Sequence, residues 1–327
     1  MRNILIVGGC GYIGRQIVDI LINKKKYKIF VIDNLSTTNK NYLNNKINFF
    51  KLDITDKSKL TTYFKINKID DVIHLAAKCI VPEGERFKTK YYKNNVIGTK
   101  NLVNICLKNK IKNFIFSSTC AVFSNNIKVV NENSLKKPKS YYGKTKLMSE
   151  KIIRTAFKNT KTKFIILRYF NVVGANIKKK IGEFNSKDRL FNNFSKQIIN
   201  KKNIYIYGNN YKTRDGTCIR DFIHVYDLAN IHIKCLDLFQ KISSYEILNC
   251  GYGKGFSILE IAKIFKKIIK QNIKILYKKQ RHGDMEEIIS SNKKLNKLIK
   301  WKPKFDNINQ MVLSTYNWHS KISKRAK

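Results

Sequence analysis

Short apolar runs alternate with amphipathic, helix-like stretches through the first half of the chain. Continuous apolar runs predict buried strands at residues 4–7, 29–32, 48–52, 71–76, 114–116 and 164–169. Apolar positions recur at helical spacing in residues 13–22, 96–107 and 145–157. Buried strands separated by helices are typical of a parallel sheet that is covered on both faces. The pattern therefore predicts an α/β fold with a doubly wound parallel sheet, the Rossmann arrangement.

The pattern loosens after about residue 175. Helix-like stretches at 190–199 and 258–269 mix with short apolar runs at 204–207 and 247–249. We interpret residues 1–175 as the Rossmann domain and residues 176–327 as a smaller α/β domain. Some segments of the second part are expected to return to the first sheet.

The charge of the chain is strongly positive. Its 327 residues include 66 Lys and Arg against 22 Asp and Glu, a formal net charge of +44. A nucleic-acid or anionic-membrane binder would have such a charge. However, the basic residues are spread evenly, and Lys, Asn and Ile are frequent throughout, as A/T-biased coding would produce. We expect no specific nucleic-acid partner, and a field that attracts anionic ligands.

Other compositional features indicate the compartment. No apolar run approaches the roughly 20 residues that span a bilayer, so we expect no membrane partner. A strand is predicted within a few residues of Met1, which leaves no room for a signal peptide. The seven cysteines are odd in number and form no CxxC pair. Reduced thiols and a cytoplasmic location fit this usage best, and no metal site is predicted.

A glycine-rich turn links the first predicted strand and helix. Gly8, Gly11 and Gly14 permit a tight turn that lets the backbone approach a diphosphate at a helix N-terminus. Asp33 ends the next strand about 20 residues later, where an acid binds a ribose diol and disfavours a 2′-phosphate. The sequence therefore predicts NAD rather than NADP. Asp53, closing the third strand, could flank the adenine or simply cap the following helix.

Hydroxyls and a Tyr–Lys pair predict acid–base chemistry. Thr119 closes the Ser-Ser-Thr that ends the fifth strand, where ligands sit in a parallel sheet, although these hydroxyls could also form a turn. Tyr142 and Lys146 are four residues apart on a predicted helix, and a cation beside a phenol lowers its pKa. Tyr42 and Lys46 share this spacing, but they follow Asp33 closely, and we interpret them as a solvated surface pair.

Together these motifs resemble the extended short-chain dehydrogenases/reductases and, among them, the UDP-glucose 4-epimerases. The resemblance covers nearly the whole chain. Further matching segments are YYKNNV at 91–96, LRYFN at 167–171, DGTCIRDFIHV at 215–225 and RHGD at 281–284. The segment at 215–225 is the most specific of these.

The resemblance implies roles for individual residues. Thr119, Tyr142 and Lys146 match the catalytic hydroxyl and the catalytic pair. NAD would be bound by Gly8, Gly11, Tyr12, Ile13, Gly14, Asp33, Asn34, Asp53, Ile54, Ala76, Asn94, Tyr142 and Lys146. The UDP-sugar would contact Thr119, Tyr142, Asn171, Leu190, Tyr207, Arg220, Arg281 and Asp284.

Several of these positions have simpler interpretations. Arg220 could form a surface ion pair with Asp221, Asn171 could cap a turn, and Tyr207 could belong to the core. The chain also departs from the family: Lys78-Cys79 displaces by one residue a lysine that the family sometimes places on NAD.

The implied activity is interconversion of UDP-glucose and UDP-galactose through a 4-keto sugar, by a homodimeric NAD-containing isomerase. Two alternatives stay open at this point. One is a 4-epimerase acting on UDP-N-acetylglucosamine or UDP-glucuronate, and the other is a non-catalytic NAD-binding protein of the same fold. The medium size of Ile288, at a position that tunes room for an N-acetyl group in the family, does not decide between sugars.

Overall fold

The computed structural model describes residues 1–38, 43, 47–125, 127–184, 188–281 and 284–325. Its largest feature is a seven-stranded sheet in the order β11-β7-β5-β4-β1-β2-β3, in which every neighbouring pair is parallel. The strands are β1 (Arg2–Val7), β2 (Tyr27–Asp33), β3 (Asn48–Lys51), β4 (Asp71–His74), β5 (Asn113–Thr119), β7 (Lys163–Tyr169) and β11 (Tyr245–Cys250). The predicted doubly wound parallel sheet is confirmed.

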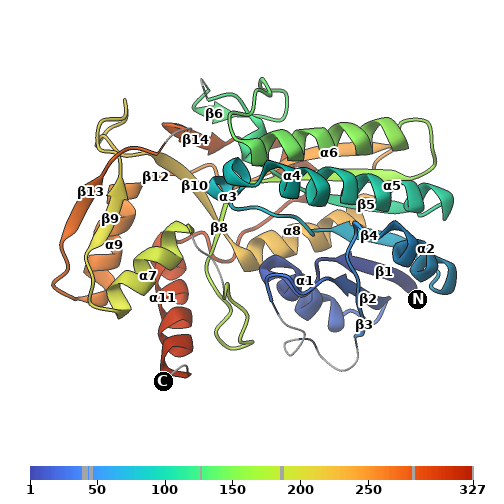
Figure 1. Cartoon of the computed structure of the whole chain (residues 1–327), viewed down its shortest axis with the longest axis horizontal. Coiled ribbons are helices and arrows are strands. Elements are labelled where there is room, and N and C mark those ends of the chain that lie inside the picture. Colours follow the sequence, from blue (N-terminus) through green and yellow to red (C-terminus); the bar gives the residue numbers. More distant parts are fainter. Residues whose placement is uncertain (39–42, 44–46, 126, 185–187, 282–283, 326–327) are drawn as a thin grey trace.

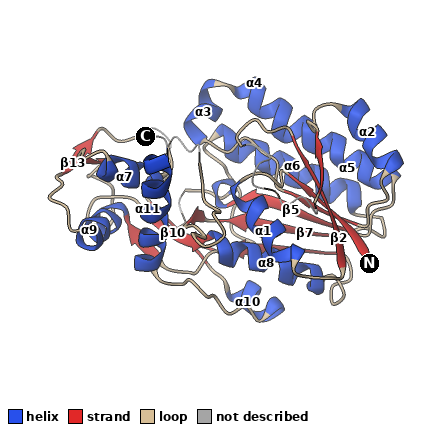
Figure 2. Cartoon of the chain, turned by 90° about the horizontal axis from the view of Figure 1, so that it is seen from below, coloured by secondary structure: helices blue, strands red, loops and turns tan. Residues whose placement is uncertain are grey.

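Helices cover both faces of this sheet (Figures 1 and 2). In β1, Ile4 and Ile6 belong to one apolar core, while the alternate residues Leu5 and Val7 belong to another. The first core includes side chains of α1 (Tyr12–Ile22) and α8 (Val225–Leu238), and the second includes those of α2 (Lys57–Ile66), α5 (Gly98–Lys108) and α6 (Tyr141–Phe157). Burial on both faces explains why the strands read as unbroken apolar runs.

The order of the strands reverses between β1 and β4. From β1 the chain proceeds to β2 and β3 on one side, whereas β4, β5, β7 and β11 extend on the other. The carboxyl ends of β1 and β4 therefore flank a crevice, the usual ligand position in such sheets. Short helices α3 (Val81–Arg86) and α4 (Lys88–Tyr91) follow β4, and a π-helical turn at Tyr92–Ile97 leads into α5.

The remaining elements form a smaller α/β part. Its larger sheet joins β12 (Gly255–Ser257), β10 (Ile219–His224), β14 (Glu287–Ser290) and β6 (Val129–Val130), and β8 (Asn171–Val173) pairs with β10. A two-stranded sheet joins β9 (Ile204–Tyr207) and β13 (Ile275–Lys278). Its helices are α7 (Leu190–Ile199), α9 (Ile258–Ile269) and α11 (Ile308–Arg325). Helix α10 (Lys293–Ile299) instead packs against α8 and β11 of the large sheet, and a 3-10 turn at Cys120–Val122 follows β5.

The chain crosses between these parts more than once. β11 comes from the second half of the sequence but pairs with β7 at the edge of the large sheet, and β6 from the first half pairs with β14. The elements α7, α9, α11 and β13 of the smaller part lie together beyond one end of the large sheet (Figure 2). None of the helices in the described part of the chain has the length and apolar character needed to span a membrane.

Candidate active site

The glycine turn after β1 is closely packed. Gly8 has φ +83°, and a Cβ there would lie 2.7 Å from the backbone nitrogen of Ala76 after β4. A Cβ on Gly14 would lie 2.4 Å from the carbonyl oxygen of Gly8. Only glycine fits at both positions, so the first turn of α1 lies directly beside the carboxyl end of β1. The backbone N–H groups of that turn are thus presented to the crevice.

Asp33 lies buried at the carboxyl end of β2. Its carboxylate accepts hydrogen bonds from the backbone nitrogen of Cys10 at 3.0 Å and of Leu35 at 2.8 Å. Burial is the main influence on this group and raises its pKa. Asp33 therefore joins the glycine turn to the start of the β2–β3 connection.

Asp53, two residues after the end of β3, is hydrogen-bonded to Asn34 in the β2–β3 connection. Its Oδ2 accepts a hydrogen bond from Asn34 Nδ2 at 2.7 Å, and its Oδ1 accepts one from the backbone nitrogen of Thr55 at 2.8 Å. The cap of α2 is Asp56, which accepts from the backbone nitrogen of Lys59. The helix-cap interpretation of Asp53 is therefore wrong.

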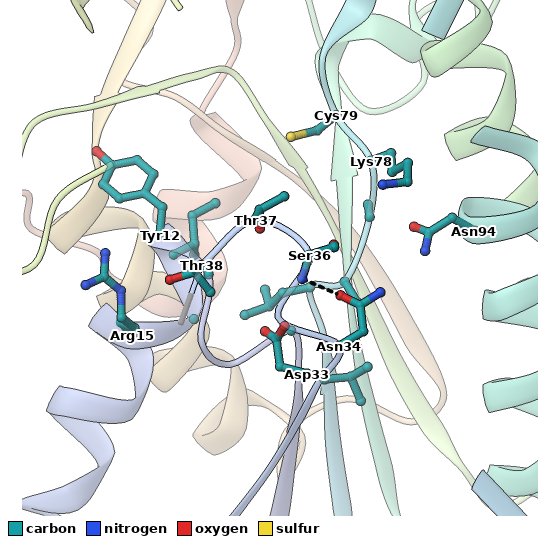
Figure 3. Close-up of a pocket in the computed structure, with 18 of the residues that line it drawn as sticks. Tyr12, Arg15, Asp33, Asn34, Ser36, Thr37, Thr38, Lys78, Cys79 and Asn94 are labelled. Carbon is teal, nitrogen blue, oxygen red and sulfur yellow. Dashed lines mark hydrogen bonds between the residues drawn. The ribbon is translucent and has the colours of Figure 1, made fainter. Parts of the chain in front are cut away.

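One continuous cleft runs from the glycine turn past the end of β4 (Figure 3). Sequence-predicted NAD residues that line it are Gly8, Gly11, Tyr12, Ile13, Gly14, Asp33, Asn34, Ile54, Ala76 and Asn94. The predicted residues Asp53, Tyr142 and Lys146 are not among the residues that line it. Sequence reasoning missed Ser36, Thr37, Lys78, Cys79 and Arg189, which also line it. Their turn positions carry no periodic pattern that could have indicated them.

Helix α6, which carries Tyr142 and Lys146, approaches the end of β5 closely. A Cβ on Gly143 would lie only 2.3 Å from the carbonyl oxygen of Ala121, in the turn that follows Thr119. Ser140 caps the helix by accepting from the backbone nitrogen of Gly143 at 3.1 Å. This approach places the Tyr142 phenol near the side chain of Thr119, which opposes the rise that burial causes in the pKa of that phenol. Two of the three predicted catalytic residues, Tyr142 and Thr119, thus come near each other because α6 packs closely at Gly143.

Burial dominates the acid–base properties of the pair. Burial raises the pKa of the Tyr142 phenol, while the guanidinium of Arg189 and the side chain of Thr119 oppose that rise. The pKa of Tyr142 is raised overall, whereas the Tyr–Lys spacing predicted that it would be lowered. Lys146 is 2% exposed, its Nζ lies 4.5 Å from the centroid of the Phe116 ring, and burial lowers its pKa to about 8.

Asn95 joins helix α6 to the cleft-lining residue Lys78 by hydrogen bonds. Its Nδ2 donates to Thr145 Oγ1 at 3.0 Å, and its side chain also bonds both backbone atoms of Lys78, at 2.8 and 2.9 Å. Ser149 Oγ donates to the backbone oxygen of Asn95 at 2.8 Å. Asn95 was not among the predicted site residues, although it stands beside Asn94 in the same matching segment.

The predicted substrate residues other than Thr119 and Tyr142 lie on the smaller part of the fold. The Arg281 guanidinium lies 3.9 Å from the centroid of the Tyr207 ring, which is 36% exposed at the end of β9. Asp284 Oδ2 accepts from the hydroxyl of Tyr211 at 3.5 Å. Because Tyr207 is exposed and carries a cation on its face, its interpretation as a core residue is wrong.

Arg220 and Asp221 point to different environments. Arg220 Nη1 donates to the backbone oxygen of Ile219 at 2.9 Å. Asp221 is fully buried and accepts from the backbone nitrogens of Tyr252 at 3.1 Å and of Gly253 at 3.0 Å. A surface ion pair between them is therefore wrong. Asn171 donates from Nδ2 to the backbone oxygen of Asp221 at 3.0 Å, which joins β8 to β10, and Leu190 is the first residue of α7.

Two predicted features fall outside the described residues. Tyr42 and Lys46, the second Tyr–Lys pair, are among the positions whose placement is not described, as are residues 282 and 283 of the segment at 281–284. The described residues include no cluster of three or more metal-ligating side chains.

Residues 4–251 match the NAD dependent epimerase/dehydratase family. The chain belongs to this family. The UDP-glucose 4-epimerase of Halalkalibacterium halodurans is 34% identical over 319 residues, covering 97% of this chain and 95% of that protein. The UDP-glucose 4-epimerase of Streptococcus mutans is also 34% identical, over 325 residues and 98% of each chain.

Solved structures of family members have the same fold. The UDP-Glc/GlcNAc 4-epimerase from Campylobacter jejuni is 36% identical, with a TM-score of 0.84 over 98% of this chain and 100% of that one. The UDP-glucose 4-epimerase from Bifidobacterium longum, solved in complex with NAD⁺ and UDP, is 30% identical, with a TM-score of 0.90 over 98% of each chain.

The cleft fits the dinucleotide of this NAD-dependent family. Its glycine turn excludes side chains at Gly8 and Gly14, which leaves backbone N–H groups to face a diphosphate. At one end, Asp33 lines the cleft with a buried carboxylate, the group that would bind a ribose diol. At the other end lie Cys79 and Asn94 (Figure 3).

Proposed function

We propose that this chain is a UDP-sugar 4-epimerase that interconverts UDP-glucose and UDP-galactose with NAD bound in the cleft. The observation that carries the proposal is the close approach of α6 to the turn after β5, which places Tyr142 near Thr119. The full-length similarity to UDP-glucose 4-epimerases supports the same conclusion.

The proposed reaction assigns one task to each catalytic side chain. Bound NAD supplies a reversible hydride acceptor for C4 of the sugar. Tyr142 Oη removes the proton from the sugar O4 and later returns it, and Thr119 Oγ1 holds the same oxygen by a hydrogen bond. Lys146, with a pKa of about 8, carries a positive charge at neutral pH and would hold the nicotinamide ribose.

The remainder of the substrate would be held by the smaller part of the fold. Arg281 and Arg220 offer planar guanidinium groups to a diphosphate, and Tyr207 offers its exposed ring to the base. Firm binding of UDP retains the 4-keto sugar while it turns over to present its opposite face. We also propose a homodimer located in the cytoplasm, consistent with the seven free cysteines. Light scattering of the purified protein tests the dimer.

The test of the reaction is Tyr142→Phe, with Tyr141→Phe as its matched control. The two tyrosines are adjacent, and both variants keep the aromatic ring while removing one hydroxyl. We expect Tyr142→Phe to lower kcat for UDP-galactose by about 10²- to 10⁴-fold, because a general acid–base residue contributes that much. Tyr141→Phe should stay within about threefold of the wild type. Near-wild-type turnover by Tyr142→Phe would contradict the assignment.

A second measurement examines the cofactor independently of turnover. The epimerase cycle leaves NAD unchanged, so the protein should copurify with it. Mass analysis of nucleotide released by denaturation should identify NAD. Release of NADP or of no dinucleotide would contradict the proposal.

A further inference from the structure

Residues 174–184, the cleft loop, connect β8 to side chains that line the cleft. Two of them, Glu183 and Phe184, line it together with the glycine turn. Asn176 and Ile181 pair as an antiparallel bridge, with N–O distances of 2.7 and 3.0 Å. This bridge brings the two ends of the cleft loop close to each other, so that one neighbouring helix can contact both.

Helix α1 contacts both ends of the cleft loop. Tyr12 Oη donates to the backbone oxygen of Gly174 at 2.5 Å, and Arg15 Nη2 donates to the backbone oxygen of Gly182 at 2.5 Å. The Arg15 guanidinium also lies 4.9 Å from the centroid of the Phe184 ring. Tyr12 and Arg15 are three residues apart on one face of α1 and line the cleft themselves (Figure 3). The cleft loop is therefore anchored to the helix that begins at the glycine turn.

Helix α11 contacts the same two ends. Thr315 Oγ1 accepts from the backbone nitrogen of Gly174 at 3.1 Å. Trp318 Nε1 donates to the backbone oxygen of Glu183 at 3.0 Å. The Trp318 ring also packs edge-on against Phe184, with ring centroids 4.9 Å apart and an interplanar angle of 71°. Trp318 thus contacts the two residues by which the cleft loop lines the cleft.

Trp318 reaches the cleft only through the cleft loop. Its side chain is 4% exposed, and it is not among the residues that line the cleft. A Cβ on Gly182 would lie 2.4 Å from the Trp318 ring, so the indole packs directly against the backbone of the loop. Phe184 contacts both this indole and the guanidinium of Arg15. Loss of the indole would therefore free the end of the cleft loop to move out of the cleft lining.

We propose that Trp318 is a positioning residue for the dinucleotide: it keeps Glu183 and Phe184 in the lining of the cleft and so slows the release of bound NAD. This inference rests on the proposed function, in which NAD occupies the cleft. An epimerase returns to the sugar the hydride that it removes, so one dinucleotide must stay bound through both transfers. A cleft loop anchored to two helices meets this requirement, because moving it would break contacts with both.

The test compares NAD release from the loaded wild type with release from Trp318→Leu and from Trp301→Leu. These are the two tryptophans of the chain and both are buried, but Trp301 stacks on Tyr252, with ring centroids 5.5 Å apart. Isotope-labelled NAD is added in excess, and mass spectrometry follows its exchange with bound NAD. We expect Trp318→Leu to raise the release rate about tenfold, because it removes a hydrogen bond and an aromatic pair. Trp301→Leu should stay within about twofold of wild type.

Two further variants distinguish positioning from a general loss of stability. Trp318→Phe keeps a ring and loses the indole N–H, so it should raise the release rate by only about threefold. Phe184→Leu removes the ring that Trp318 contacts inside the cleft lining. Because residues in contact have non-additive effects, Trp318→Leu combined with Phe184→Leu should raise release by clearly less than the product of the two single effects.

Three results would overturn the inference. The first is an equal change of the release rate in Trp318→Leu and Trp301→Leu. The second is release at the wild-type rate from Trp318→Phe, and the third is multiplication of the effects of Trp318→Leu and Phe184→Leu. A wild-type protein that binds no NAD would instead refute the proposed function.

Discussion

At the scale of single residues, side chains of the candidate site contact other residues than their spacing in the sequence predicts. Lys146 was predicted from its position four residues after Tyr142, yet its Nζ lies over Phe116. The cation whose charge counters the burial of Tyr142 is Arg189, which is 47 positions away in sequence. Helical spacing identifies which residues share a face. It does not identify the side chains that other elements bring to that face.

Cys79 offers a residue-scale test of where NAD binds. It is the one exposed cysteine of the seven in the chain, and it lines the cleft beside Lys78 (Figure 3). We therefore expect a maleimide to label Cys79 first, and saturating NAD added to NAD-stripped protein to slow that labelling at least about tenfold. Mass spectrometry of labelled peptides measures the rates. Cys79→Ser, which lacks the target thiol, is the control for labelling elsewhere. Equal labelling rates with and without NAD would place the dinucleotide outside this cleft.

At the scale of elements, local patterns predicted the interiors of helices and strands well, and their ends less well. The helix at 190–199 and the strand at 204–207 have the bounds that the periodicity indicates. β5, by contrast, runs three residues beyond its predicted apolar core, to Thr119. Its polar end is buried because Ser118 bonds Glu150 of α6. Hydropathy alone cannot distinguish a loop residue from a buried polar residue whose hydrogen-bond partner lies far away in the sequence.

The packing of α6 on β5 leads to a prediction about Gly143. In Gly143→Ala the added methyl group would lie 2.3 Å from the Ala121 oxygen, so the helix must move away from the turn after Thr119. We expect kcat to fall by about 10²-fold, since a displacement of about 1 Å between reacting groups has that effect. Lys144→Ala, at the exposed neighbouring position, should keep kcat within about twofold. Steady-state assays report kcat, and thermal unfolding verifies that both variants are folded. A fully active Gly143→Ala variant would mean that the close approach is not needed.

At the scale of the whole molecule, the two parts of the fold meet at a buried carboxylate. Asp221 of β10 accepts hydrogen bonds from Tyr252 and Gly253, which follow β11 of the large sheet, and from the backbone nitrogen of Ser290 in β14. A Cβ on Gly251 would lie 2.5 Å from Asp221 Oδ2, so the chain passes tightly against this carboxylate. The motif at 215–225 was recognised in the sequence, but the role of Asp221 in joining the sheets was not. That role depends on β11 returning to the first sheet, which involves contacts far apart in sequence.

The burial of Asp221 predicts a pH dependence of stability. Burial raises its pKa to about 6, above the value of about 3.9 for an unfolded chain. The folded state therefore retains the proton more strongly than the unfolded state does. The resulting stabilisation is fully present below about pH 4 and is lost as the pH rises through about 6.

Asp221→Asn isolates this contribution, because the amide does not titrate. We expect the free energy of unfolding of wild type, minus that of the variant, to fall by roughly 2–3 kcal/mol between pH 4 and pH 7. Urea unfolding of both proteins across this range measures the difference, and titration of all other groups cancels in it. A difference that stays constant with pH would show that the hydrogen bonds from Tyr252, Gly253 and Ser290 compensate the buried charge completely.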